Sequence, residues 1–257
     1  MLFRERRASL SKARHIADEE LFLPGSMVMK THIIGDIHGC SRPFEELLGI
    51  LDPDPSGDRI ILLGDLFDRG PDSWGVLQIV KKLADDFGER FVLLRGNHED
   101  YLLQPKLSFS MKRMWERVGR GAAVRSFKEH GEKMEDCAPW IEEHSVLYYK
   151  GDGFSCVHAG LMADPPEVND IFTLVHDHDI VLQNRYAGPL AVTGHIALGM
   201  PAYFAGDGEN VIVLSENQWR DLPANGIICI DAGCGRGGTL IGMVIEDGRY
   251  ILYGAEE

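Results

Sequence analysis

The first hundred residues of the chain alternate short apolar runs with longer amphipathic segments. Residues 32–36, 59–65 and 91–94 have the length and apolar content of buried strands. Residues 44–51 and 73–87 place apolar side chains three or four positions apart, as on one face of a helix. The order strand, helix, strand, helix, strand predicts parallel strands joined by helical crossovers.

The remainder of the chain changes from helical to strand patterns. Residues 101–145 are rich in helix formers, with helices expected at 111–117 and 122–130. Asp247-Gly248 is a strong hairpin signal. The patterns together predict an α+β fold whose first half is α/β-like. Ser73 is the expected N-cap of its helix, and the expected strands are 145–149, 154–157, 190–193, 211–214, 226–230, 239–245 and 250–253.

The first thirty residues differ in character from the rest of the chain. They are polar, carry several basic residues at their start, and are separated from the later segments by Pro24-Gly25. Because chain ends are poorly ordered unless they are tied down, we expect a peripheral arm at 1–30. A chain of 257 residues suits one large domain, which we place at 31–257.

The composition excludes several kinds of partner. The formal net charge of −14 argues against a nucleic-acid scaffold, which needs a basic surface to displace counterions. No apolar stretch approaches the ~20 residues of a membrane span. Five cysteines without a CxxC pair predict free thiols and a cytoplasmic location. A phosphate substrate would need local cations to offset the negative charge.

Polar clusters follow the first three predicted strands: GDIHG at 35–39, GDLFDRG at 64–70 and GNHED at 96–100. In open α/β sheets the site lies beyond the carboxyl ends of the strands, which is where these clusters fall. They present carboxylate, imidazole and amide ligands, a set that suits manganese, with iron or zinc as alternatives. The ligand candidates in these clusters are Asp36, His38, Asp65 and Asn97.

Two further histidines, His158 in VHAGL and His195 in VTGHIAL, each follow a predicted strand close to a glycine. Six side chains are enough for two divalent metal ions if one carboxylate bridges them, and Asp65 is the expected bridge. The first ion is assigned His38 and mainly Asp36, and the second Asn97, His158 and His195.

The ordered motifs GDxHG, GDxxDRG and GNHE, followed by histidines after VHAG and VxGH, resemble the phosphoprotein phosphatase branch of the calcineurin-like metallophosphoesterases. The resemblance covers roughly residues 31–245, which makes 31–257 the catalytic domain. It implies a four-layer fold, in which a central β-sandwich of two mixed sheets is flanked by helices. It also implies a site with two metal ions.

The resemblance assigns roles to residues around the ligands. A hydroxide held between the ions attacks phosphorus, His98 protonates the leaving oxygen, and Asp68 orients His98. Arg69 and Arg95 are expected to contact the phosphate, since a planar guanidinium matches its oxygens. Arg185 in VLQNRY matches an arginine of bacterial members, although Gln183 stands where tryptophan is common.

Other features favour structural interpretations. The segment His176-Asp177-His178-Asp179 has no glycine or strand end beside it and is expected to be a solvated loop. The glycine-rich segment 233–238 is expected to be a turn, although it could form an amide nest for phosphate. Cys40 is expected to be a packed thiol, and Trp115 a core residue.

The metal chemistry does not select a substrate. A bacterial serine/threonine protein phosphatase is favoured, since GDLFDRG keeps Asp68 and Arg69 and GNHE keeps Glu99. The alternatives are a symmetrical diadenosine tetraphosphate hydrolase and a catalytically silent, metal-bound binding module. The expected partner is accordingly a phosphorylated protein or a small phosphate compound, and the oligomeric state stays open.

Overall fold

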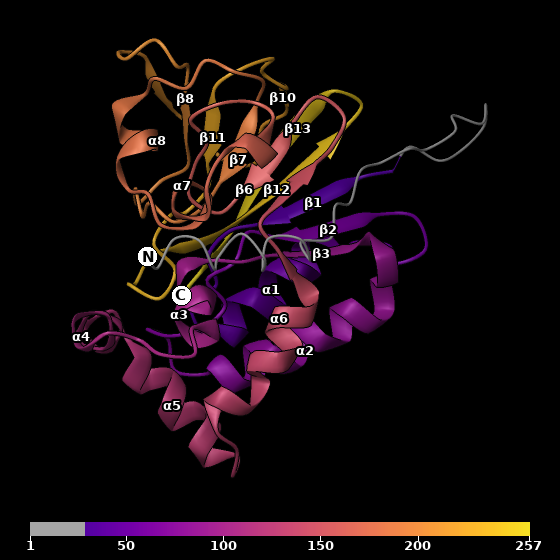
Figure 1. Cartoon of the computed structure of the whole chain (residues 1–257). Coiled ribbons are helices and arrows are strands. Elements are labelled where there is room, and N and C mark those ends of the chain that lie inside the picture. Colours follow the sequence, from indigo (N-terminus) through magenta and orange to yellow (C-terminus); the bar gives the residue numbers. More distant parts are fainter. Residues whose placement is uncertain (1–28) are drawn as a thin grey trace.

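The computed structural model describes residues 29–257, so most of the predicted N-terminal arm lies outside the described residues. Two β-sheets pack face to face, with helices on the outer sides (Figure 1). The predicted sandwich of two mixed sheets flanked by helices is therefore confirmed.

The first sheet has seven strands in the order β10-β13-β12-β1-β2-β3-β4. The neighbours β1, β2, β3 and β4 run parallel, whereas β12 pairs antiparallel with both β1 and β13. The hairpin predicted at Asp247-Gly248 joins β12 to β13. The bounds are β1 (Thr31–Ile34), β2 (Arg59–Leu62), β3 (Phe91–Leu94), β4 (Ser145–Val146), β10 (Arg220–Asp221), β12 (Thr239–Glu246) and β13 (Arg249–Glu256).

The second sheet has six strands in the order β5-β6-β7-β11-β8-β9. Its three central neighbours β6, β7 and β11 run parallel. The carboxyl ends of these strands therefore lie at one edge of the sheet, as those of β1, β2 and β3 do in the first. The bounds are β5 (Tyr148–Lys150), β6 (Ser155–Val157), β7 (Ala191–Thr193), β8 (Ala202–Phe204), β9 (Val211–Val213) and β11 (Ile227–Cys229).

Three apolar clusters separate the four layers. Successive residues of a strand face opposite sides, so Ile60 and Leu62 of β2 belong to the cluster under the helices, while Ile61 belongs to the cluster that also contains Ile228 of the second sheet. On the outer face of the second sheet, Ile227 packs with residues of α7 and α8. The helices are α1 (Ser41–Leu51), α2 (Ser73–Phe87), η3 (Gly88–Arg90), α3 (Asn97–Leu103), α4 (Phe109–Arg117), α5 (Arg120–Glu129), η4 (Met134–Cys137), α6 (Ala138–His144), η5 (Pro166–Val168), α7 (Ile171–Val175) and α8 (Asp179–Gln183).

Two local predictions are wrong. The strand expected at 145–149 divides at Leu147, because the chain leaves β4 in the first sheet there and enters β5 in the second. The N-cap of α2 is Asp72 rather than Ser73, since the Asp72 carboxylate accepts the Gly75 N–H at 2.9 Å. Among the helices of residues 29–257, none combines the length and apolar character needed to span a bilayer.

Candidate metal centre

The carboxyl ends of the parallel strands of both sheets meet at one place. The His195 N–H, just after β7, donates to both carboxylate oxygens of Asp36, which follows β1, at 3.0 and 3.2 Å. His158 follows β6, and its Nδ1 lies 2.7 Å from the Leu63 carbonyl oxygen at the end of β2. These contacts join segments of the two sheets that are up to 159 residues apart in sequence. The structure thereby brings together the side chains predicted to bind metal.

Glycines permit this close approach. A Cβ at Gly194 would lie 2.0 Å from Asp36 Oδ1, so no other residue could precede His195 without displacing the carboxylate. Among residues 29–257, nine non-glycine residues have positive φ, and five of them belong to the site. Such backbone conformations cost about 1–3 kcal/mol each and are retained mainly at functional positions. The five are His38, Asp65, Asp68, Arg69 and His195.

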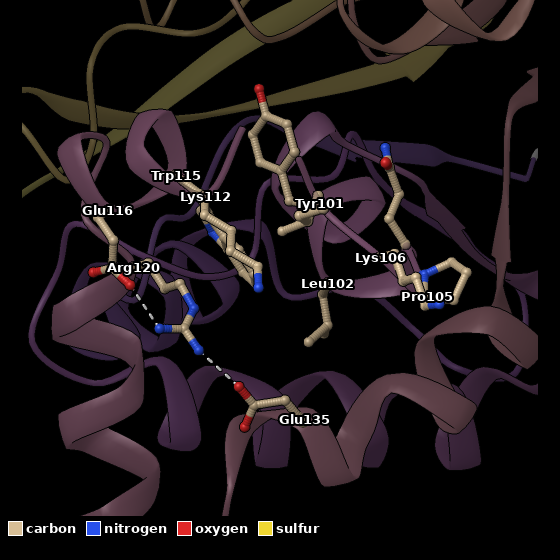
Figure 2. Close-up of a pocket in the computed structure, with 11 residues that line it drawn as sticks. Tyr101, Leu102, Pro105, Lys106, Lys112, Trp115, Glu116, Arg120 and Glu135 are labelled. Atoms are coloured by element: carbon tan, nitrogen blue, oxygen red, sulfur yellow. Dashed lines mark hydrogen bonds and ion pairs between the residues drawn. The ribbon is translucent and has the colours of Figure 1, made fainter. Parts of the chain in front are cut away.

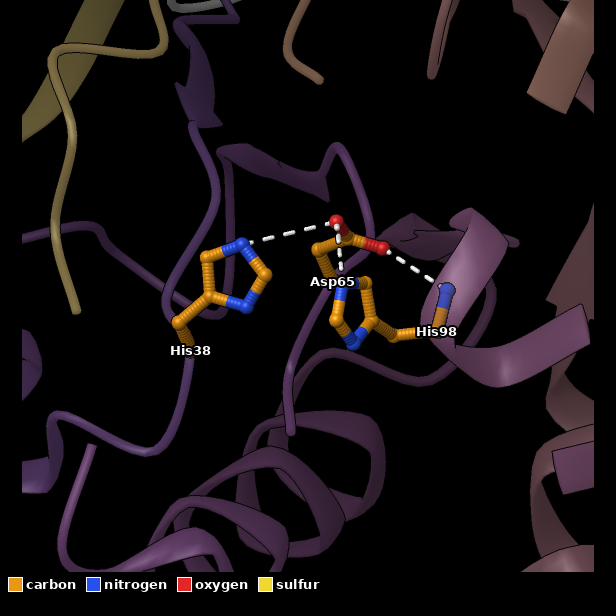
Figure 3. Close-up of side chains that lie close together, drawn as sticks. All are labelled: His38, Asp65 and His98. Atoms are coloured by element: carbon orange, nitrogen blue, oxygen red, sulfur yellow. Dashed lines mark hydrogen bonds and ion pairs between the residues drawn. The ribbon is translucent and has the colours of Figure 1, made fainter. Parts of the chain in front are cut away.

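Asp65 lies between two groups of histidines. Its Oδ2 is 3.4 Å from His38 Nε2, and its Oδ1 is 3.4 Å from His158 Nε2. His38 and His98 approach the carboxylate from two directions (Figure 3). The ligand atoms of each group lie within 4.8 Å of one another. We call the set His38, Asp65 and His98 the first cluster, and the set Asp65, His158 and His195 the second cluster.

The hydrogen bonds of two histidines leave their inward-facing nitrogens unprotonated, which is the form that binds a cation. His38 Nδ1 lies 2.9 Å from the Phe67 carbonyl oxygen, and His158 Nδ1 lies close to that of Leu63. A carbonyl oxygen only accepts, so both Nδ1 atoms carry the proton. The lone pair is then on Nε2, which faces Asp65 in both cases. The Asn97 amide oxygen lies 3.2 Å from His158 Nε2, on the side of the second cluster.

The electrostatics of the site also fit bound cations. Burial lowers the pKa values of His38, His158 and His195, so these imidazoles favour the neutral form that ligates metals. Burial, with the nearby carboxylates of Asp231 and Asp65, raises the pKa of Asp36 well above its ordinary value. Buried carboxylates that repel one another indicate a place for added positive charge.

His98 differs from the other histidines of the site. Its Nδ1 lies 2.5 Å from Asp68 Oδ2, and its backbone N–H donates to Asp65 Oδ1 at 3.1 Å. Burial acts to lower the pKa of His98, but Asp65 and Asp68 outweigh it and raise that pKa above 6.5. His98 therefore favours the protonated form, which suits a proton donor.

Glu99 has a structural role at the site that the sequence did not reveal. Its carboxylate accepts the N–H groups of Asp65, Leu66 and Gly96 at 2.8, 2.9 and 3.0 Å. It thereby ties the turn after β2 to the turn after β3. Burial, followed by the charge of Asp65, raises the pKa of Glu99 to about 7. Only its position directly after His98 could have pointed to it.

The three predicted phosphate-binding arginines have different surroundings. The Arg69 guanidinium contacts His38 Nε2 and so lies at the first cluster. The side chain of Arg95 is held at the edge of β3 by Ser145 Oγ, 3.3 Å from its Nε. Arg185 is exposed, and within residues 29–257 it has no hydrogen bond or ion pair with the site.

Three further residues reach the site without having been predicted to do so. Asp231 follows β11, is 1% exposed, and has a buried Oδ2 without a hydrogen-bond partner among the described residues. His178 Nδ1 lies 3.3 Å from His195 Nε2, and His176 Nε2 lies 2.8 Å from Asp100 Oδ2. The predicted solvated loop is found at His178, which is exposed between α7 and α8, but both histidines of this segment also make contacts that the prediction did not include.

The remaining predictions concern packing. Gly235 and Gly237 donate their N–H groups to the Glu257 carboxylate at 2.9 and 2.7 Å, so the glycine-rich turn binds an anion of its own chain. Cys40 is 2% exposed, and Trp115 is 5% exposed and part of the core.

A family model described as calcineurin-like phosphoesterase matches residues 29–224. The chain belongs to this family. The metallophosphoesterase resemblance drawn from the motifs is thus confirmed at the level of the superfamily. The clusters around Asp65 are compatible with the divalent metal centre of such phosphoesterases.

Individual relatives of this phosphoesterase carry a more specific name. The symmetrical bis(5'-nucleosyl)-tetraphosphatase of Aromatoleum aromaticum is 36% identical over 134 residues, which are 52% of this chain and 45% of the relative. The enzyme of the same name from Coxiella burnetii is 31% identical over 192 residues, which are 74% of this chain and 56% of the relative. The chain thus spans about half the length of the curated relatives it matches.

A solved structure supports the fold. The metallophosphoesterase from Sphaerobacter thermophilus superposes with a TM-score of 0.60 at 18% identity, covering 89% of each chain. At this identity the similarity concerns the fold alone.

The names of the curated relatives do not support the predicted serine/threonine protein phosphatase, and they favour the stated alternative, a symmetrical tetraphosphatase.

Proposed function

We propose that this phosphoesterase hydrolyses symmetrical dinucleoside tetraphosphates at a centre of two divalent cations. One observation carries the two-cation part: the two oxygens of Asp65 face histidines of two separate clusters. Asp36, His38 and Asp65 would hold the first cation. Asp65, Asn97, His158 and His195 would hold the second. Oxygen and imidazole donors without thiolate favour manganese, with iron or zinc as alternatives.

The cations, when bound, neutralise phosphate charge and lower the pKa of a coordinated water. The protein supplies the proton for the leaving group. With its Nδ1 directed to Asp68, His98 presents Nε2 near the shared carboxylate, 3.7 Å from Asp65 Oδ2. This nitrogen donates to the leaving oxygen, and Asp68 stabilises the charged imidazolium beforehand.

The arginine at the first cluster binds the substrate. Arg69 is half-buried and its guanidinium already lies beside His38. Planar guanidinium groups bind phosphate oxygens in pairs, so Arg69 is the primary phosphate contact. Arg95 is the second, whereas exposed Arg185 has no contact that supports the role assigned to it from the sequence.

The choice of substrate rests on the relatives. Both relatives described above are named as symmetrical tetraphosphatases, and the chain is at least 31% identical to each. In the expected reaction, water attacks one of the two inner phosphorus atoms of the tetraphosphate. The central P–O–P bond breaks, and two nucleoside diphosphates are released. Phosphoserine and phosphothreonine peptides, the substrates expected from the motifs, are therefore tested beside the dinucleotide.

A rate comparison tests this function. The full chain, loaded with manganese, is given diadenosine tetraphosphate, p-nitrophenyl phosphate, and phosphoserine, phosphothreonine and phosphotyrosine peptides. We expect kcat/KM for the dinucleotide to exceed that for every peptide by more than about tenfold, or 1.4 kcal/mol, with ADP as the sole nucleotide product. Faster turnover of a phosphopeptide would support the protein phosphatase instead. Complete inactivity with manganese, iron and zinc would support the silent binding module.

A further inference from the structure

The Asp68–His98 pair has a third member in the helical layer. Trp115 Nε1 donates to Asp68 Oδ2 at 2.5 Å, the same oxygen that lies 2.5 Å from His98 Nδ1. Asp68 Oδ1 is buried and has no hydrogen-bond partner within the described chain. Among the described residues, Trp115 and His98 are thus the side chains that orient this carboxylate.

We infer that Trp115 is a positioning residue for proton donation by His98. An indole N–H only donates, so it holds Asp68 Oδ2 as an acceptor. Two donors on one oxygen fix the orientation of this carboxylate, so that it faces His98 Nδ1 as an acceptor. The Nε2 atom of His98 then stays directed toward the shared carboxylate of Asp65. The inference rests on the proposed role of His98.

Two contacts hold the indole of Trp115 in place: Asp68 accepts its N–H, and Arg120 lies over its ring. Trp115 is the one buried residue of α4. The Arg120 guanidinium lies over its ring, 4.8 Å from the ring centre. Arg120 is itself held by Glu116 and Glu135, each at 2.7 Å.

Trp115 also borders open space. A cavity of about 630 Å³ is lined by Trp115, Arg120, Tyr101 and neighbouring side chains (Figure 2). The indole thus stands between this cavity and the catalytic pair. Because Trp115 is not enclosed by core residues on all sides, a change to the smaller phenylalanine is expected to be tolerated.

The first experiment compares substrates with a poor and a good leaving group, because a positioning role and a packing role of Trp115 predict different effects on the two. Trp115→Phe keeps an aromatic ring and removes the N–H. General-acid assistance matters most when the leaving group is poor, so kcat should fall about 10- to 100-fold on phenyl phosphate, with KM nearly unchanged. On p-nitrophenyl phosphate, a good leaving group, kcat should change little. Equal losses on both substrates would assign Trp115 a packing role and overturn the inference.

A matched control is available in the same layer. Trp74 Nε1 is buried without a hydrogen-bond partner among residues 29–257, and its ring stacks on His130. Trp74→Phe should therefore leave both rates unchanged. His98→Asn serves as the reference. If that variant shows no dependence on the leaving group, the proposed role of His98 as proton donor fails, whereas failure of Trp115→Phe alone overturns only the positioning role of Trp115.

A second measurement needs no variant at Trp115. In the metal-free protein, the indole proton of Trp115 should resonate downfield of the other three tryptophans, because its acceptor is a carboxylate. Asp68→Asn should shift this resonance and leave the others in place. An indole resonance of Trp115 that does not respond to Asp68→Asn would contradict the contact.

Discussion

The two sheets contribute to one centre in different ways. The first sheet presents multi-residue turns after three parallel strands, and these turns hold proposed ligands, the proposed proton donor and its partner. The second sheet presents single residues after three parallel strands. From the first sheet come Asp36, His38, Asp65, Asp68, Asn97 and His98, and from the second His158, His195 and Asp231.

The difference teaches how one centre obtains histidines with opposite protonation. On the first-sheet side, Asp65 and Asp68 outweigh burial and raise the pKa of His98, whereas burial lowers the pKa of His38. On the second-sheet side, burial dominates and lowers the pKa values of His158 and His195. Charge placed by the turns therefore separates a proton donor from metal ligands within one buried site.

The largest expected effect comes from removing the residue that both clusters share. Asp65→Asn should lower kcat by about 10³- to 10⁴-fold or more, since several kcal/mol of charge stabilisation depend on the cations. Metal analysis should show both ions lost. Asp221→Asn is the control, because that side chain is 95% exposed and pairs with Arg249 at the surface. Retention of one tightly bound ion by Asp65→Asn would show that Asp65 is not a bridge.

The next prediction compares the replacement of His98, after a first-sheet strand, with the replacement of His158, after a second-sheet strand. His98→Asn should lower kcat by about 10²- to 10⁴-fold while both metal ions stay bound, which is the scale for a general acid. His158→Asn should instead lose the ion of the second cluster. Metal content and kcat are measured on both variants. Loss of metal from His98→Asn would make His98 a ligand and end its assignment as proton donor.

A smaller effect is expected at Asp231 of the second sheet. Its charge, together with burial, raises the pKa of Asp36, so it adds to the negative charge that a cation at the first cluster would neutralise. Asp231→Asn should weaken manganese binding about 10- to 100-fold, as for other residues just outside a ligand set. Titration calorimetry of the metal-free protein measures this affinity. An unchanged affinity would restrict Asp231 to a structural role.

The smallest effect is the order in which the histidines titrate. In the metal-free protein, lowering the pH should protonate His98 first, above its ordinary pKa of 6.5. His158 and His195 should take up protons only below 6.5. Nuclear magnetic resonance of the imidazole groups follows each residue separately. Protonation of His158 before His98 would remove the distinction between the proposed proton donor and the proposed metal ligands.

The sequence predicted that the turns after the first three strands of the first sheet would lie together. Gly-Asp and Gly-Asn at the ends of apolar runs combine a strand, a tight turn and a ligand within a few residues. Parallel strands then place these turns at one edge, which is why Asp36, Asp65 and Asn97 could be grouped before the fold was known. The two histidines after β6 and β7 could be added because the motifs gave their order.

The rest of the site could not be predicted, because it depends on contacts distant in sequence. Trp115 lies 47 residues from Asp68, and the pattern of α4 shows only a buried aromatic residue. His178 belongs to a polar segment that resembles an ordinary loop until the packing of α7 and α8 places it beside His195. The strand expected at 145–149 likewise divides at Leu147 because the chain passes from the first sheet to the second there. The local sequence pattern does not indicate this change of sheet.

The central claim is that two cations share Asp65. Anomalous diffraction from crystals of the full chain grown with manganese tests it most directly. We expect two peaks, one on each side of the Asp65 carboxylate, with His38 next to one peak and His158 next to the other. A single peak, or two peaks of which one lies away from Asp65, would contradict the claim.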